Sequence, residues 1–330
     1  MALKEELAEH IRAQGPITIA EYMERCVSHY YATRDPFGAG GDFTTAPEIS
    51  QIFGELIGAW IEDRWQHISG AQAVLCELGP GRGTLMKDIL RVTRNSGLHE
   101  SADVVLVEAS PALRELQKRT LAYAHTRIRW QETLMNLPPL PLFLIANEFF
   151  DALPVHQYLE KEEKKVGLIM NQLAFLPDGK VVREASPACI AVMTQIAAHI
   201  QTHGGAALII DYGYDDAVQG DSVQAVKAHQ FIHPLDAPGE SDITAHVDFA
   251  ALKDVAASVG AYVWGVAKQG NFLNALGAQV RLLALGKHAS PEQGASLRSG
   301  LERLVSYEQM GGLFKVMAVT STPDVPSGFD

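Results

Sequence analysis

From residue 73 onward, short apolar strand segments alternate with amphipathic helices, and this alternation constrains the fold more than any other feature. One helix opens at Ser110-Pro111, because serine is a favourable N-cap and proline suits the first helical turn. Strict alternation predicts an α/β fold with a doubly wound, mostly parallel sheet that carries helices on both faces. Strands are expected at 74–78, 104–107, 127–130, 142–145, 207–210, 262–264 and 314–317, and later helices near 188–203, 247–259 and 293–309.

The first 70 residues predict helices only, so we expect an N-terminal helical cap or lid, residues 1–70, before a main domain of residues 71–330. Two insertions are expected in the main domain, at about 155–205 and 215–250. The first should contain an antiparallel hairpin that turns at Pro177-Asp-Gly179, where proline and glycine favour a turn.

The strongest helix of the cap has two further signals. Thr45-x-x-Glu48 has the spacing of a capping box and predicts the start of this helix. Gly54 and Gly58 lie four residues apart within it. Because each glycine costs helix propensity, the pair predicts close packing against another backbone.

Composition narrows the class of partner and the compartment. The 330 residues include 27 lysines and arginines against 39 acidic residues, a formal net charge of −12, which argues against nucleic-acid binding and fits a cationic partner or simple solubility. Cys26, Cys76 and Cys189 form no C-x-x-C pair, which favours a reducing compartment over a disulfide framework. No segment is long and apolar enough to insert into a membrane, and the first residues contain no signal core, so we expect a cytoplasmic protein.

The central motif is Glu77-Leu-Gly-Pro-Gly-Arg-Gly-Thr84, between a strand and a helix. Glycines at this place let a ligand approach bare backbone at the helix N-terminus. A phosphate-binding P-loop would need a lysine near the end of the motif, and a dinucleotide loop would need glycine or alanine where Thr84 stands. The remaining pattern, acidic-x-Gly-x-Gly-x-Gly, resembles motif I of the class I S-adenosylmethionine methyltransferases, and the candidate cofactor-binding residues are Glu77, Gly79, Pro80, Gly81 and Gly83.

Polar residues at the ends of the next two strands support an adenosine-type cofactor. The second strand ends in Glu108, whose carboxylate can accept hydrogen bonds from both ribose hydroxyls. Gln131 and Glu132 follow the third strand, where an adenine amino group would lie. The alternative for these last two residues is a solvated loop.

The fourth strand runs into Asn147-Glu-Phe-Phe-Asp151. Ligands of open parallel sheets bind beyond the carboxyl ends of the strands, so Asn147, Glu148 and Asp151 should point toward the reacting groups. Paired carboxylates can hold a guanidinium group and take up its proton as the nitrogen becomes nucleophilic. The alternative is that Glu148 and Asp151 cap the following turn.

Four blocks of the sequence, at 35–54, 77–85, 147–154 and 242–249, closely resemble the MidA-like methyltransferases. The resemblance implies a Rossmann-like class I methyltransferase fold and S-adenosylmethionine (SAM) as the cofactor. Mitochondrial members of this family are protein arginine methyltransferases that assist assembly of respiratory complex I. The resemblance therefore implies a protein arginine acceptor and a respiratory-complex subunit as a partner.

By resemblance, the loop glycines and Glu108 bind the cofactor. Asn147, after the fourth strand, is a further candidate for cofactor binding. The resemblance also implies that a segment between residues 41 and 48 helps to close the active site. Its substrate-side residues would be Asp42, Phe43, Thr44, Thr45 and Glu48.

His246 is the third catalytic candidate beside Glu148 and Asp151. His246 or Asp248 could line the acceptor cleft; otherwise the two cap the helix that begins at Val247. His229 and His233 have a zinc-like interval, but no cysteine lies near, so we expect no metal site.

Two other functions remain open at this point. One is a nicotinamide-dependent oxidoreductase, against which the residue at the end of the glycine loop counts. The other is a non-catalytic SAM-binding assembly factor, or chaperone, for a client protein. A small-molecule methyl acceptor also remains open.

Overall fold

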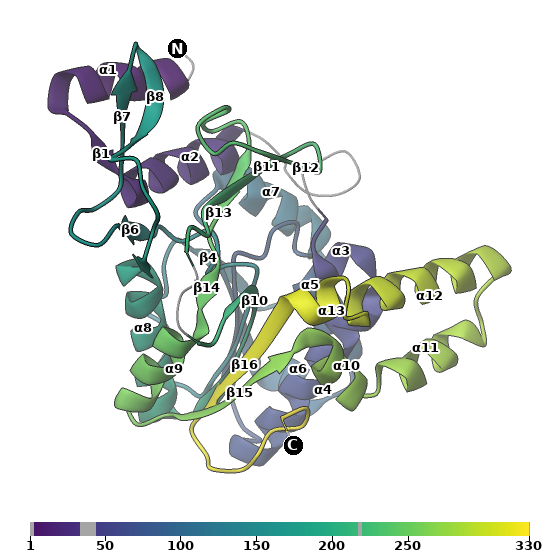
Figure 1. Ribbon diagram of the computed structural model, residues 1–330. Coiled ribbons are helices and arrows are strands. Elements are labelled where there is room, and N and C mark those ends of the chain that lie inside the picture. The colour runs from purple at the N-terminus through teal and green to yellow at the C-terminus, as the bar shows by residue number, and fades with distance from the viewer. Residues whose placement is uncertain (1–2, 34–43, 217–219, 330) are drawn as a thin grey trace.

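The computed structural model describes residues 3–33, 44–216 and 220–329 (Figure 1). The main sheet consists, in spatial order, of β15 (Tyr262–Lys268), β16 (Phe314–Thr320), β10 (Gly205–Tyr214), β5 (Leu142–Asn147), β2 (Ala73–Leu78), β3 (Ala102–Val107) and β4 (Ile128–Gln131), with the short β14 (Val247–Asp248) beside the end of β10. The strands from β10 to β4 are all parallel, and β16 runs antiparallel to both of its neighbours, β10 and β15. The predicted doubly wound, mostly parallel sheet is confirmed.

Successive strand residues face opposite sides of this sheet, as the two-residue period of a strand requires. Leu75 and Phe143 face one core, and Cys76 and Leu144 face the other. The second core is covered by α8 (Pro187–His203) and α9 (Phe249–Ser258). The first is covered by α4 (Gln51–Ile68), α5 (Thr84–Val92), α6 (Gly97–Ser101), the end of α7 (Pro111–Thr120), α10 (Gln269–Ala275), α11 (Ala278–Gly286), α12 (Pro291–Val305) and α13 (Met310–Leu313).

The glycine pair in α4 marks its crossing with α5. A Cβ atom at Gly54 would lie 2.6 Å from Asp88 Cβ, and one at Gly58 would lie 2.5 Å from Val92 Cγ1. A Cβ at Gly58 would also lie 3.1 Å from the Cα of Ile89. The predicted close packing against another backbone is therefore confirmed.

The predicted capping box at the start of this helix is wrong. Thr45 precedes only a single turn, α3 (Ala46–Ile49), and its side chain makes no capping hydrogen bond. The long helix begins one turn later, where the Ser50 hydroxyl accepts a hydrogen bond from the backbone N–H of Ile52. The Glu48 carboxylate accepts instead from the hydroxyl of Thr84, a tertiary contact that the local sequence does not encode.

A third, smaller core lies beside the carboxyl ends of the main strands. It contains side chains of α1 (Leu3–Gln14), α2 (Ile19–Thr33), β1 (Ile17–Thr18) and β7 (Lys165–Ile169), among them Leu7, Met23 and Val166. The helices of the predicted cap, residues 1–70, therefore pack in two different cores. α1 and α2 belong to the third core, whereas α4 belongs to the first. The division at residue 70 remains a prediction.

The region predicted as the first insertion contains a hairpin of β7 and β8 (Gln172–Leu176), in which β7 also pairs with β1. Its turn is at Met170 and Asn171, both with left-handed backbone (φ 47° and 70°), and not at the predicted Pro177-Asp-Gly179. Two left-handed residues give the tight turn that matches strand twist, and asparagine tolerates this conformation. The same insertion contributes the short pair β6 (His156–Tyr158) and β9 (Arg183–Ala185).

The region predicted as the second insertion contains a three-stranded antiparallel sheet of β12 (Gln230–Ile232), β11 (Gln224–Lys227) and β13 (Asp242–Thr244). On one of its faces Ile243 packs into the third core. Figure 1 places this sheet beside α2, above the carboxyl end of β10. Among the described residues no helix is long and apolar enough to cross a membrane.

Candidate functional site

A cavity of about 990 Å³ lies at the carboxyl edge of the main sheet. Its floor comes from the ends of β2, β3, β5 and β10, and its walls come from α2, α3, the three-stranded sheet and the region of α12 and α13. This is the position at which open parallel sheets bind ligands. Its volume lies at the upper end of the range of ligand pockets, which leaves room for a cofactor and an acceptor.

The glycine turn after β2 forms one end of the cavity. Gly79 (φ 58°), Gly81 (φ 52°) and Gly83 (φ 81°) all have left-handed backbone, which side chains rarely adopt. Gly79, Pro80 and Gly81 line the cavity. Gly83 does not, because it is the N-cap residue of α5 and faces Gln117 and Leu121 behind the turn.

Glu77 lies at the end of β2 beneath this turn and is only 3% exposed. Burial raises the pKa of its carboxyl to about 8. Its Oε2 atom is buried and has no hydrogen-bond partner among the described residues, although the residue lines the cavity. A buried oxygen without a donor is costly, so this atom is a ready acceptor for a donor group of a ligand.

Glu108 lies at the end of β3, also on the cavity wall. Its Oε1 accepts from the backbone N–H of Ser110 (2.8 Å), and its Oε2 accepts from the amide of Gln117 (3.2 Å). The same amide donates to the carbonyl of Gly81 (2.8 Å), and the Gln117 oxygen accepts from the indole of Trp130 (2.9 Å). Gln117 therefore links three parts of the site: the glycine turn through Gly81, Glu108 after β3, and Trp130 in β4.

The two polar residues at the end of β4 lie in different surroundings. Glu132 lines the cavity, and its carboxylate lies 3.4 Å from the guanidinium of Arg114. Gln131 is not part of the lining, and its amide donates to the backbone carbonyl of Thr133. Only one residue of the predicted adenine-side pair therefore reaches the cavity.

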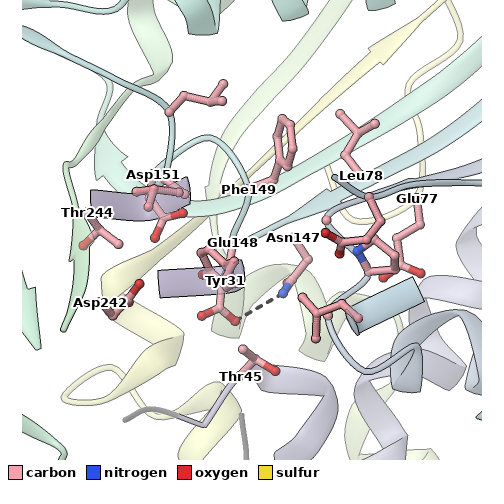
Figure 2. A pocket seen from close by; sticks show the side chains of 18 of the residues that line it. Tyr31, Thr45, Glu77, Leu78, Asn147, Glu148, Phe149, Asp151, Asp242 and Thr244 are labelled. Atoms are coloured by element: carbon pink, nitrogen blue, oxygen red, sulfur yellow. Dashed lines mark hydrogen bonds between the residues drawn. The ribbon is translucent and has the colours of Figure 1, made fainter. Parts of the chain in front are cut away.

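The turn after β5 brings Asn147, Glu148 and Asp151 together at the centre of the cavity (Figure 2). Glu148 has left-handed backbone (φ 52°), an uncommon conformation for a residue with a side chain. Its Oε1 accepts from the Asn147 amide (3.2 Å) and from the backbone N–H of Ala46 (3.3 Å). Burial and the neighbouring Asp151 raise the pKa of Glu148 to about 8.

A buried aspartate that sequence reasoning missed holds this turn. Asp211, near the end of β10, accepts hydrogen bonds at one oxygen from the backbone N–H groups of Phe150 (3.0 Å) and Asp151 (3.2 Å). Burial raises the pKa of Asp151 to about 6, and a hydrogen bond from the hydroxyl of Tyr212 opposes that rise. Tyr212 is in turn hydrogen-bonded by Thr244, so residues on β10 and β13 fix the position of the Asp151 carboxyl.

The remaining predicted site residues are divided. Thr45 and Glu48 line the cavity, and Thr44 does not. Asp42 and Phe43 lie outside the described residues. His246 lines the cavity, with its ring edge against Tyr212 and its pKa lowered by burial, whereas Asp248 caps α9 through the backbone N–H of Ala251.

Comparison with known proteins gives this cavity its context. Residues 56–174 and 165–267 match the model of a family described as "Putative S-adenosyl-L-methionine-dependent methyltransferase". The chain belongs to this family. Two similar relatives are the Drosophila melanogaster homolog of the mitochondrial protein arginine methyltransferase NDUFAF7, 34% identical over 96% of this chain and 84% of its own, and the human protein of that name, 34% identical over 94% and 81%.

A solved structure agrees with the family assignment over the whole chain. The crystal structure of a Burkholderia thailandensis protein bound to S-adenosyl-homocysteine has a TM-score of 0.82 and 26% identity, and it covers 99% of this chain and 92% of its own. The fold of this methyltransferase is accordingly that of the class I SAM-dependent enzymes, and its cofactor is SAM.

The cavity fits that cofactor at the glycine end. Glu77 and Asn147 each hold a buried side-chain oxygen that no described residue satisfies, and both residues line the cavity. Such oxygens suit the ammonium group of a methionine moiety. The bare backbone of Gly79 and Gly81 lines the same cavity, together with Glu108.

Proposed function

We propose that this methyltransferase methylates an arginine side chain of a protein. The observation that carries the proposal is the pair of carboxyls, half-buried Glu148 and buried Asp151, held on one turn that lines the cavity. The names of the curated relatives, protein arginine methyltransferases, support the same acceptor. The glycine turn, Glu77, Glu108, Glu132 and Asn147 are proposed to hold the cofactor beside this pair.

The charge of the cavity favours a cationic acceptor. Of the described lining residues, seven carry carboxyls and two carry guanidinium groups; the acids are Glu48, Glu77, Glu108, Glu132, Glu148, Asp151 and Asp242, and the bases are Arg82 and Arg303. Burial without enough positive charge keeps the pKa values of Glu77 and Glu148 high. A bound cation would lower both pKa values, because the charged carboxylate then gains a partner.

The proposed chemistry assigns separate tasks to the two oxygens of Glu148. SAM, when bound, supplies a methyl group on a positively charged sulfur. Oε1 of Glu148 is held by Asn147 and Ala46, while Oε2 has no such partner among the described residues and is available to a guanidinium N–H. Methylation of that nitrogen displaces one N–H proton, and Glu148 or Asp151 is placed to accept it. A guanidinium is otherwise protonated at all ordinary pH values.

The test compares Glu148→Gln and Asp151→Asn with Glu302→Gln, an exposed acid on α12 outside the cavity. We expect transfer of labelled methyl from SAM to protein, with methylarginine in the hydrolysate, to fall by about 10²- to 10⁴-fold in the two cavity variants. SAM affinity measured by calorimetry should stay close to the wild-type value in all three. Unchanged transfer in Glu148→Gln would remove the carboxylate from the proposal.

The same experiment addresses the alternative functions. Wild-type protein that binds SAM but labels no acceptor would favour the non-catalytic assembly factor. Methylation of a small molecule in place of protein would retain the enzyme and change the acceptor. The family assignment leaves the nicotinamide oxidoreductase without support.

We further propose a compartment and a partner for this protein. Cys26, Cys76 and Cys189 are free thiols, which supports a reducing compartment such as the cytoplasm. The curated relatives are named as mitochondrial, so cell fractionation is the deciding measurement. A respiratory-complex subunit remains the acceptor that the family resemblance suggests.

A further inference from the structure

One wall of the cavity is the face of a β-sheet. In the second insertion, Phe231 of β12 pairs with Val226 of β11, and Val226 pairs with Asp242 of β13. Directly paired residues point to the same face, so these three side chains form a row across the sheet. All three line the cavity, as does the neighbouring pair Gln224 and Thr244.

This row runs from solvent into the acidic end of the cavity. The side chain of Phe231 is 76% exposed, Val226 is half-buried, and Asp242 is 8% exposed. Figure 2 shows Asp242, Thr244 and Asp151 on one side of Glu148 and Glu77 on the other. The sheet therefore borders the part of the cavity that faces away from the glycine turn.

Exposed single aromatic residues are common on protein surfaces, so exposure of Phe231 alone would carry little meaning. Its position is informative because it lies on the rim of an acidic cavity and in register with Val226. Leu313 of α13 lines the same cavity and is 54% exposed, which adds a second apolar side chain. An apolar rim around a carboxylate-lined interior matches an arginine, whose apolar stem carries a charged end.

We propose that this sheet face is the docking wall for the polypeptide around the methyl acceptor. Val226 packs along the aliphatic stem of the acceptor arginine, and Phe231 contacts an apolar side chain that flanks that arginine. The partner is a polypeptide segment with an arginine next to an apolar residue, rather than free arginine. This inference rests on the proposed arginine methylation and adds the surface that binds the acceptor polypeptide and the apolar residue beside its arginine.

The test measures binding to the protein saturated with S-adenosyl-homocysteine, so that turnover is not required. The probes are two fluorescent peptides with one central arginine, flanked by leucines or by serines, and N-acetyl-arginine methylamide. The variant is Phe231→Ala, and the matched control is Tyr123→Ala, which removes a 95% exposed aromatic ring outside the cavity lining. Both side chains are exposed, so both variants should fold.

We expect the wild type and Tyr123→Ala to bind the leucine-flanked peptide roughly tenfold more tightly than the serine-flanked peptide. Phe231→Ala should lose this preference and bind N-acetyl-arginine methylamide as the wild type does. A preserved preference in Phe231→Ala would overturn the docking wall and leave arginine methylation intact. If no arginine probe binds the wild type saturated with S-adenosyl-homocysteine, both the arginine acceptor and the docking wall are rejected.

Discussion

At the glycine turn, the backbone conformation and the access of the cofactor depend on the same residues. Gly81 has a φ of 52° and lies on the cavity wall, so a side chain there would meet both backbone strain and the space that we propose for the cofactor. Gly70 offers a matched position, because its φ is 60° and nothing lies within 4 Å of an added Cβ atom. The two sites separate backbone strain from loss of ligand space.

We therefore expect Gly81→Val to abolish SAM binding while Gly70→Val retains it. Both variants should lose a similar free energy of unfolding, about 1–2 kcal/mol, because both place a branched residue in left-handed backbone. Calorimetry with SAM and chemical denaturation provide the two measurements. Equal SAM affinity in the two variants would mean that the glycine turn does not surround the cofactor.

At the level of single residues, the sequence predicts side chains that stand at strand ends and misses those that reach the site from elsewhere. Glu77, Glu108 and Glu148 could be found because each lies at or shortly after the end of an apolar strand segment. Gln117 lies inside a helix, and its role depends on three tertiary hydrogen bonds. Asp211 directly follows a predicted strand and could have been found by the same rule as Glu148.

At the level of elements, the packing of α4 against α5 leaves no space for a side chain at Gly58. Gly58→Ala should lower the free energy of unfolding by about 1–3 kcal/mol, because its methyl group would meet Val92 and Ile89. Gly286→Ala, in α11 with open space around it, should raise that free energy by up to about 1 kcal/mol through helix propensity. Chemical denaturation of both variants checks the opposite signs, and a stabilising Gly58→Ala would contradict this crossing.

The elements of the main sheet could be predicted, whereas the short strands β11, β12 and β13 could not. The strands and helices of the main sheet follow from apolar runs and from caps such as Ser110. The β11–β12–β13 sheet has strands of three or four residues, too few for alternation to be recognised. The sequence predicts the turn of the first hairpin in the wrong place, because Met170-Asn171 is a weaker turn signal than Pro177-Asp-Gly179.

At the level of the whole molecule, buried carboxyls make stability depend on pH. The pKa values of Glu77 and Glu148 are raised from their ordinary value of 4.5 to about 8 in the folded protein. A raised pKa means that the folded state binds the proton more tightly than the unfolded chain does. The stability from these groups is therefore fully present below pH 4.5 and is lost as the pH rises through about 8.

We expect the Tm of the ligand-free protein to fall between pH 6 and pH 8.5. The double variant Glu77→Gln, Glu148→Gln should have a shallower fall, since glutamine does not titrate. Differential scanning calorimetry in buffers of constant ionic strength measures both slopes. Parallel slopes for the wild type and the double variant would place the pH dependence in other groups.

The β11–β12–β13 sheet has a consequence for how such a protein can diversify. Val226 and Asp242 face the cavity, whereas Ala225 and Ile243, one position away on the same strands, face the opposite side, where Ile243 packs into the third core. Substitutions at one set alter the surface that a ligand meets, and substitutions at the other alter folding. Selectivity and robustness can therefore be inherited, or engineered, as nearly independent traits on neighbouring residues of the same short strands.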